Sequence, residues 1–360
     1  MLERIAPSKL GLSDSRLDRV GEWLEQQISS QRLAGASVMI GRRGAIGYAR
    51  AAGLADVERA TPFTEDTIVR IFSMTKPITS VAAMMLYEQG CFQLDDPVAK
   101  YLPEFAATQV WKGPGHGLED VEPQHSPMLI KHLLTHTSGL TYGFMNTNVV
   151  DAAYRAQQLE FPGKAATLAE WVEGLASVPL LCQPGSQWNY SVATDVLGRL
   201  VEVWSQQELA SFFNEHIFAP LAMGDTAFSV APQNQSRFAA LYAPLSGGDM
   251  SSVGRKSSAP SEQPRGGLKQ MESSLQSSYF NQPKLCSGGG GLTGTLADYA
   301  RFCQMLLNGG ELDGERLLSP TTVNHMRLNQ LPDGRDMAAM GQPVWSETSY
   351  DGIGFGLGFA

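Results

Sequence analysis

The order of hydrophobic and polar positions in the first part of the chain predicts an amphipathic helix followed by a strand hairpin. Five apolar residues recur at helical spacing and would form one face of the helix: Leu17, Val20, Trp23, Leu24 and Ile28. Gly35 ends this pattern. Two apolar runs follow, residues 36–40 and 45–51, with turn-like residues 41–44 between them. We expect these runs to pair as strands.

The next apolar segment has no polar face. A strand is expected over residues 67–71, and a helix begins near Ser73. From Ile78 to Tyr87 the helix is apolar on nearly every side, which is typical of a helix buried all round. Gly90 then supplies a C-terminal stop. This helix is therefore predicted to lie inside the core.

From about residue 110 to residue 245 the pattern is helical with long loops. Ser191 is the expected N-cap of one helix, whose apolar positions are Val196, Leu197, Leu200, Val201 and Trp204. Residues 244–283 are rich in Ser, Gly, Gln and Pro and poor in aliphatic side chains. That composition predicts a long surface insertion or flap.

Globular character returns with the glycine run at residues 288–291. Thr295, with Asp298 three residues later, is the expected cap of a helix. Its predicted apolar face consists of Leu296, Tyr299, Ala300, Cys303, Leu306 and Leu307. Residues 353–360 alternate glycine with apolar side chains and are predicted to be a strand that another backbone approaches closely.

Composition narrows the class of protein. Hydrophobic residues make up 43% of the 360 positions, the net charge is −9, and the basic residues are scattered, so no nucleic-acid partner is expected. The N-terminus has no apolar signal region, and the longest apolar run is far too short to cross a bilayer. We expect a cytoplasmic protein with no membrane partner. Four cysteines without C-x-x-C spacing predict free thiols and no zinc motif: Cys91, Cys182, Cys286 and Cys303.

The sequence Ser73-Met74-Thr75-Lys76 is the clearest candidate for chemistry. Residues three apart share one face of a helix, so the Lys76 ammonium can reach the Ser73 hydroxyl. At the start of a helix, Ser73 is favoured by the dipole as negative charge develops, and its N–H can donate to an oxyanion. A serine hydroxyl needs such activation to become a nucleophile. On its own, the spacing also fits a serine that caps a helix and a lysine exposed to solvent. The helix is apolar on nearly every side, however, and this favours the catalytic interpretation.

Several ordered segments resemble family VIII carboxylesterases and class C β-lactamases, in the serine β-lactamase and penicillin-binding-protein superfamily. Residues 72–79 are similar to the nucleophile motif of these families. Residues 94–98, 133–140, 184–185, 190–191, 289–292 and 298–302 follow in the family's order. The resemblance implies an α/β (α+β) fold of the β-lactamase/transpeptidase type. An antiparallel sheet flanked by helices would comprise residues 1–110 and 285–360, beside an all-helical domain of residues 111–284 with a flexible insertion at about 244–283.

The resemblance also implies roles for individual residues. Ser73 matches the nucleophile, Lys76 its activating lysine, and Tyr190 the tyrosine of the second motif, which would act as general base and later protonate the leaving group. Val192 stands where β-lactamases have an asparagine, as is common in the esterase branch. Tyr142 is expected to line the substrate pocket. No metal and no cofactor are expected.

The third motif of the family, Lys-Thr-Gly, His-x-Gly or Trp-Gly-Gly, is expected beyond Ala360. Its strand supplies the second oxyanion N–H in relatives. The resemblance therefore predicts that the 360 residues lack part of the active site, together with the strands and final helix that complete the sheet.

Other candidate residues are assigned structural roles. His132 and His136 have a spacing that can bind metal, but no H-E-x-x-H motif accompanies them. Asp95 and Asp96 are expected in a turn. The predicted function is hydrolysis of short-chain esters through an acyl-enzyme on Ser73. β-Lactam or D-alanyl-D-alanine peptide hydrolysis on the same residues is one alternative, and an incomplete member that only binds a small ligand is another. The sequence does not indicate an oligomeric state.

Overall fold

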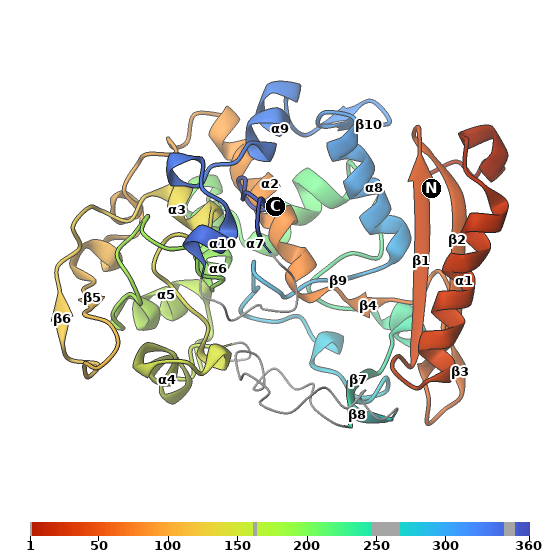
Figure 1. Ribbon diagram of the computed structural model, residues 1–360, viewed down its shortest axis with the longest axis horizontal. Coiled ribbons are helices and arrows are strands. Elements are labelled where there is room, and N and C mark those ends of the chain that lie inside the picture. The colour runs from red at the N-terminus through yellow and green to blue at the C-terminus, as the bar shows by residue number, and fades with distance from the viewer. Residues whose placement is uncertain (1, 161–163, 246–266, 342–349) are drawn as a thin grey trace.

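A computed structural model describes residues 2–160, 164–245, 267–341 and 350–360. An antiparallel sheet of β1 (Gly35–Arg42), β2 (Ala45–Asp56) and β3 (Thr61–Pro62) forms one edge of the molecule (Figure 1). Gly35 pairs with Gly53 and Arg42 with Ala45, with a register shift after Ile40. Helix α1 (Asp14–Ser29) contacts β2, and α8 (Leu296–Leu307) contacts β1. The expected helix-flanked antiparallel sheet is confirmed.

The first helix buries a narrower face than predicted. Leu17 and Leu24 are buried, but Trp23 is 56% exposed. At 100° per residue, Trp23 lies about 110° away from the line through Leu17 and Leu24, so it points to the side of the helix. Its place on the apolar face was therefore a wrong prediction.

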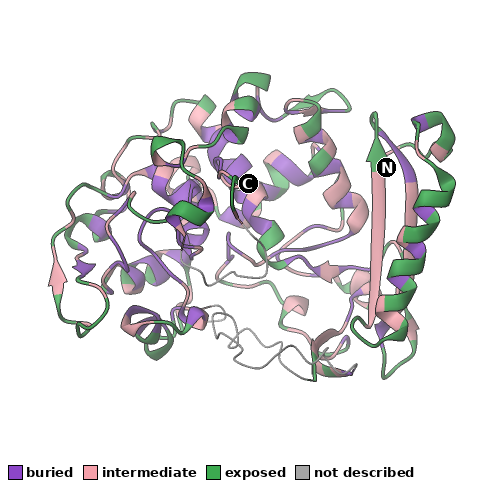
Figure 2. Cartoon of the chain, in the orientation of Figure 1, coloured by how far each residue is buried: buried purple, intermediate pink, exposed green. Residues whose placement is uncertain are grey.

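Helix α2 (Thr75–Glu88) crosses the centre of the molecule and is preceded by the 3-10 turn η2 (Phe72–Met74). Residues on all its sides are buried, as the purple of this helix in Figure 2 shows, and the helix packs against α6 (Ala193–Ser205). The helix ends before Gly90, which has a φ of +76°. The predicted buried helix is confirmed.

The strand that leads into this helix is shorter than predicted. Only β4 (Val69–Arg70) forms a ladder, with β9 (Thr293–Gly294). The residues on either side of this ladder make single main-chain hydrogen bonds: the N–H of Ile68 donates to Arg237 O, and that of Ile71 donates to Leu292 O. The chain thus turns into η2 immediately after the ladder.

On the side of α2 away from the sheet lie α3 (Ile130–Leu134), α4 (Val149–Ala156), α5 (Leu168–Ala176) and α6 (Figure 1). Helix α7 (Leu209–Phe213) runs into a π-helical turn, η6 (Asn214–Phe218), and β5 (Val110–Trp111) pairs with β6 (Val121–Glu122). Helix α6 begins after Val192. Ser191 is therefore not its N-cap as predicted: its Oγ shares a hydrogen bond with His136 and accepts one from Ala193 N–H.

The predicted insertion at residues 244–283 contains regular structure. Strand β7 (Leu241–Pro244) pairs with β8 (Leu268–Glu272), and a 3-10 turn, η9 (Ser278–Phe280), follows. Residues 246–266, the centre of the predicted flap, lie outside the described part of the chain. The sequence pattern missed β8 because Lys269, Gln270 and Glu272 interrupt its apolar residues, one of which, Met271, is 55% exposed.

Toward the C-terminus, α8 is followed by β10 (Glu311–Leu312), β11 (Glu315–Arg316), α9 (Pro320–Arg327) and α10 (Met337–Met340). Residues 353–360 do not form the predicted strand. The N–H of Leu357 donates to Met326 O, and Gly356 bonds back to Phe359, so the segment curls against α9. A φ of +104° at Gly358 is incompatible with a regular strand.

Short 3-10 turns connect these elements: η1 (Pro7–Leu10), η3 (Val98–Lys100), η4 (Pro103–Ala107), η5 (Gly143–Met145), η7 (Pro232–Arg237) and η10 (Pro332–Gly334). Within the described ranges, no helix combines the length and the hydrophobicity needed to span a bilayer.

Candidate active site

Ser73 lies in the 3-10 turn at the entrance to α2, and its side chain is exposed. The preceding residue, Phe72, has a φ of +43°, an unusual value for a large side chain. Two contacts hold the turn: Met74 N–H donates to Ile71 O at 3.0 Å, and the Tyr299 hydroxyl of α8 donates to Met74 O at 3.1 Å. The hydroxyl of Ser73 is thus presented at the surface of a fixed turn.

Lys76 follows one helical turn later and is only 4% exposed. Its Nζ donates to Ser73 Oγ at 3.3 Å, to the Tyr142 hydroxyl at 3.0 Å and to the carbonyl oxygen of Gly289 at 2.6 Å. An ammonium has three N–H groups, so these three acceptors use all of its donors. Lys76 is therefore arranged as a cation that donates to the serine oxygen.

The glycine run between β8 and β9 lies directly on α2. Thr79 donates to Gly288 O at 2.7 Å, and Thr75 accepts a hydrogen bond from Leu292 N–H at 3.2 Å. A Cβ on Gly289 would lie 2.4 Å from Asp195 Oδ2, so only glycine fits there. The glycine run was recognised in the sequence, but its contact with Lys76 was not: the run brings the main-chain carbonyl of Gly289 to the ammonium.

Two tyrosines surround the ammonium. Lys76 Nζ lies 4.7 Å from the ring centroid of Tyr190 and 5.5 Å from that of Tyr142, distances at which cations interact with aromatic faces. The two rings are 5.5 Å apart, and Tyr142 stacks on Phe144 at 4.7 Å. Burial raises the pKa of Tyr142 well above its usual value, and the charge of Asp195 adds to the rise. Tyr142 is therefore a neutral phenol that accepts from Lys76.

The structure thus brings together four of the five predicted site residues: Ser73, Lys76, Tyr142 and Tyr190. The bond between Tyr142 and Lys76 was not predicted, because 66 positions separate them and no local pattern links them. The fifth residue, Val192, has no exposed surface and belongs to the main core. Its contact with a substrate stays a prediction.

His136 lies beside the tyrosines. Its carbonyl accepts from Asn189 N–H at 2.8 Å, its ring centroid is 4.9 Å from that of Tyr190, and its Nδ1 is 3.2 Å from Ser191 Oγ. Burial, with a smaller effect of the Lys76 charge, lowers the pKa of His136 to about 3. A neutral imidazole bound in this way holds the segment that carries Tyr190.

His132 is used elsewhere. Its Nδ1 accepts from Leu129 N–H at 3.1 Å at the start of α3, and burial lowers its pKa to about 4. Asp96 accepts from Gln93 N–H at 2.8 Å, which confirms its predicted turn role. In the part of the chain that the structure describes, no three His, Cys, Asp or Glu side chains gather as a metal-binding set.

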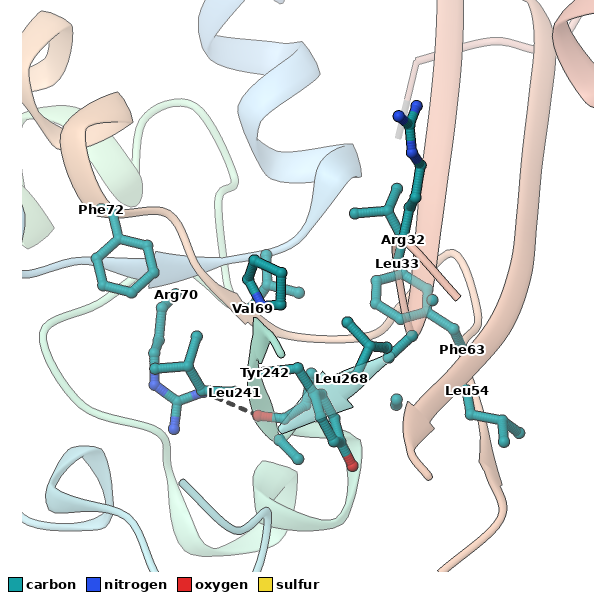
Figure 3. Close-up of a pocket in the computed structure, with 16 residues that line it drawn as sticks. Arg32, Leu33, Leu54, Phe63, Val69, Arg70, Phe72, Leu241, Tyr242 and Leu268 are labelled. Atoms are coloured by element: carbon teal, nitrogen blue, oxygen red, sulfur yellow. Dashed lines mark hydrogen bonds between the residues drawn. The ribbon is translucent and has the colours of Figure 1, made fainter. Parts of the chain in front are cut away.

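A hollow of about 290 Å³ lies between β1 and the β7–β8 hairpin (Figure 3). Phe72 and Arg70 line it, but Lys76 and the two tyrosines do not. Arg70 is buried, donates to Ala239 O at 2.9 Å, pairs with Glu272 at 2.8 Å and lies 4.3 Å from the ring centroid of Phe238. This hollow is therefore separate from the oxygen atoms around Lys76.

Comparison of the sequence with known proteins shows the family to which the chain belongs. The model of the family described as Beta-lactamase matches residues 20–359. Protein Rv1367c of Mycobacterium tuberculosis is 36% identical over 326 residues, 90% of this chain and 74% of that protein. Esterase EstB of Burkholderia gladioli is 39% identical over 231 residues, 63% of this chain and 54% of EstB. Acyltransferase calJ of Penicillium decumbens is 30% identical over 86% of this chain and 70% of its own length.

Solved structures of similar proteins share the fold of this chain. EstCE1, described as a hydrolase with promiscuous acyltransferase activity, superposes with a TM-score of 0.72 at 28% identity, over 95% of this chain and 81% of EstCE1. Unliganded simvastatin synthase from Aspergillus terreus gives 0.69 at 26% identity, over 89% of this chain and 73% of the synthase. The expected α/β fold of the β-lactamase/transpeptidase type is confirmed. The chain belongs to the β-lactamase family and is a serine hydrolase.

Proposed function

We propose that the protein is a carboxylesterase that hydrolyses short-chain esters through an acyl-enzyme on Ser73, activated by Lys76 and Tyr190. One observation carries the proposal: a buried ammonium donates to the serine oxygen while its other two N–H groups are held by Gly289 and Tyr142. A positive charge fixed at this distance stabilises the serine oxygen as it loses its proton.

The proton needs an acceptor other than Lys76, whose donors are all used. Tyr190 lies with its ring over the Lys76 ammonium, 4.7 Å from Nζ to the ring centroid, so we assign the role of proton acceptor to its side chain. Tyr190 takes the proton as Ser73 Oγ attacks the ester carbonyl, and the Ser73 N–H donates to the oxyanion. When the C–O bond breaks, the alcohol leaves with the proton from Tyr190. Water then attacks the acyl-enzyme by the same steps, and the acid is released.

We expect ester substrates to be favoured over β-lactams, because Val192 stands at the position of the β-lactamase asparagine and leaves no side-chain group there to hydrogen-bond an acylamide. Leaving that amide unpaired costs about 1–3 kcal/mol. We expect kcat/KM for p-nitrophenyl butyrate to exceed that for nitrocefin. A higher value for the cephalosporin would favour the alternative, β-lactam or D-alanyl-D-alanine peptide hydrolysis by the same residues.

A second candidate is acyl transfer to an alcohol, favoured by the similarity to calJ over 86% of this chain. The acyl-enzyme is the same, and an alcohol replaces water. Product analysis of p-nitrophenyl butyrate turnover, with a primary alcohol added, separates butyrate from the new ester.

The nucleophile is tested by labelling with a serine-directed fluorophosphonate and locating the adduct by peptide mass. A single adduct on Ser73 is expected, with none on a Ser73→Ala control. Ser191 and Ser287, which lie nearby but are engaged with His136 and Asp195, serve as internal comparisons. An adduct on another serine contradicts the proposal.

A further inference from the structure

The carbonyl that holds Lys76 belongs to a residue with little restraint of its own. Gly289 has no side chain, so its φ and ψ are free unless other contacts fix them. Its carbonyl oxygen makes the shortest of the three Lys76 contacts, 2.6 Å. Whatever fixes Gly289 therefore also fixes the ammonium.

Asp195 provides that restraint. It lies in the first turn of α6, fully buried, five residues after Tyr190. Its Oδ1 accepts from Gly289 N–H at 2.9 Å and from Ser287 Oγ at 2.6 Å. The two bonds hold the chain on both sides of Gly288, immediately before the carbonyl that faces Lys76.

The second oxygen of Asp195 is also informative. Among the described residues, Oδ2 is buried and has no hydrogen-bond partner, an expensive arrangement for a carboxylate. Burial raises the pKa of Asp195, and the positive charge of Lys76 opposes that rise. A buried carboxylate with one oxygen unpartnered is weak evidence for a contribution to stability, so its effect on its neighbours becomes the question.

We infer that Asp195 is a positioning residue that holds Lys76 beside Ser73 through the main chain of Gly289, and that its charge balances the ammonium. The inference rests on the proposed function. It assigns to the first turn of α6 a role in positioning Lys76, in addition to that of Tyr190, which lies three residues before the helix. Asp195 itself reaches Ser73 only through Gly289 and Lys76.

The variants separate the hydrogen bonds from the charge. Asp195→Asn keeps an oxygen for both donors but removes the charge, whereas Asp195→Ala removes both. Displacing a catalytic group by about 1 Å costs about a hundredfold in rate. We expect kcat of Asp195→Ala to fall about a hundredfold with KM little changed, and that of Asp195→Asn to fall less than about tenfold. Rates are taken per site labelled by the fluorophosphonate, so misfolded protein does not count.

The pH profile of kcat/KM gives a readout that a purely structural role would not move. Removing a negative charge favours the deprotonated form of every group that faces it, so the profile of Asp195→Asn should move to lower pH. The charge of Asp195 acts on Lys76 and Tyr142. The other groups that face these two are Tyr190, His136 and Glu160.

Asp298→Asn is the matched control. Asp298 is also a buried carboxylate in the first turn of a helix, and it accepts from Asp225 N–H at 2.8 Å and from the Thr226 hydroxyl at 2.9 Å. This variant should lower stability while kcat per labelled site and the pH profile stay unchanged. Should Asp195→Ala not fold, Ser287→Ala removes one bond to Oδ1 and keeps the charge, and we expect a several-fold lower kcat.

Three results would overturn the inference. They are an Asp195→Ala enzyme within about twofold of wild type, an unmoved pH profile in Asp195→Asn, and an unchanged kcat in Ser287→Ala. If the wild-type enzyme is not labelled at Ser73, the proposed function fails. The positioning role of Asp195 is then tested by crystal structures of the wild type and of Asp195→Ala. Lys76 Nζ should leave Gly289 O in Asp195→Ala, and an unchanged contact there would refute the role.

Discussion

Two buried cations lie three residues on either side of Ser73, and their surroundings differ. Arg70, in β4, forms an ion pair with Glu272 at 2.8 Å and lies over the ring of Phe238. Lys76, in α2, is held by neutral oxygens and by the face of Tyr190. The charge of Arg70 is matched by a carboxylate in contact with it, whereas that of Lys76 is balanced from behind Gly289.

Under the proposed function, this difference separates a structural cation, Arg70, from a cation that acts on Ser73, Lys76. A guanidinium bound to a carboxylate has little field left to act on a third group. An ammonium held by neutral oxygens keeps its field, and here one of those oxygens belongs to Ser73, the proposed nucleophile. The comparison predicts that substitutions around Lys76 affect turnover, and that substitutions around Arg70 affect stability.

The largest effect is expected from Lys76→Ala. The nucleophile loses its buried cation, and kcat/KM for p-nitrophenyl butyrate should fall by at least about a hundredfold, the scale of losing a general acid–base group. Arg70→Met is the control, because it removes the other buried cation, three residues before Ser73. Per labelled site it should keep kcat within about fivefold. Equal losses in the two variants would break the comparison.

Removing the two tyrosine hydroxyls is expected to have unequal effects. Tyr190→Phe removes the proposed proton acceptor, and kcat should fall by at least about a hundredfold. Tyr142→Phe removes one acceptor from Lys76 and should cost about tenfold, because a hydrogen bond to a charged group contributes about 1.5 kcal/mol. Steady-state kinetics and a thermal melt of each variant check this. The reverse order would make Tyr142 the base and Tyr190 a packing residue.

The smallest effect on turnover is expected from Glu272→Gln, which leaves Arg70 without its carboxylate. The Glu272 side chain is 27% exposed, so solvent screens part of the loss and we expect about 1 kcal/mol. That corresponds to a lower Tm by about 2–4 °C. Activity should stay within about twofold. A tenfold loss of kcat with an unchanged Tm would show that the Arg70 pair acts on Ser73.

The parts of the site set by local geometry could be predicted from the sequence. Ser73 and Lys76 are one helical turn apart, and the 3.3 Å contact follows from that spacing. The buried α2 and the Thr295 cap of α8, which accepts from Asp298 N–H, were predicted for the same reason. Tyr142, Gly289 and Asp195 reach Lys76 only through the tertiary fold, and no pattern of spacing could assign those contacts.

The spacing of apolar residues predicted the wrong buried face for α8, which has apolar residues on several sides. For α8 the predicted face included Cys303 and Leu307, which are exposed, with Leu307 at 80%. The structure buries Phe302 and Met305 with Asp298 and Arg301 instead. Arg301 faces inward because it donates to the Leu221 carbonyl and to Asp313. A polar residue satisfied by tertiary contacts looks like solvent-facing surface in a sequence.

The glycine run packs closely against α2 and α6, and this packing also limits which amino-acid substitutions the protein tolerates there. At codon 289 any replacement brings a carbon to 2.4 Å from Asp195 Oδ2, and at codon 288 to 2.9 Å from Thr194 O. At codon 290 the nearest atom is 3.8 Å away, an ordinary contact. In a library of variants selected for activity, alanine should therefore survive at position 290 and disappear at positions 288 and 289. Neighbouring codons with the same amino acid would then carry very different selective constraints.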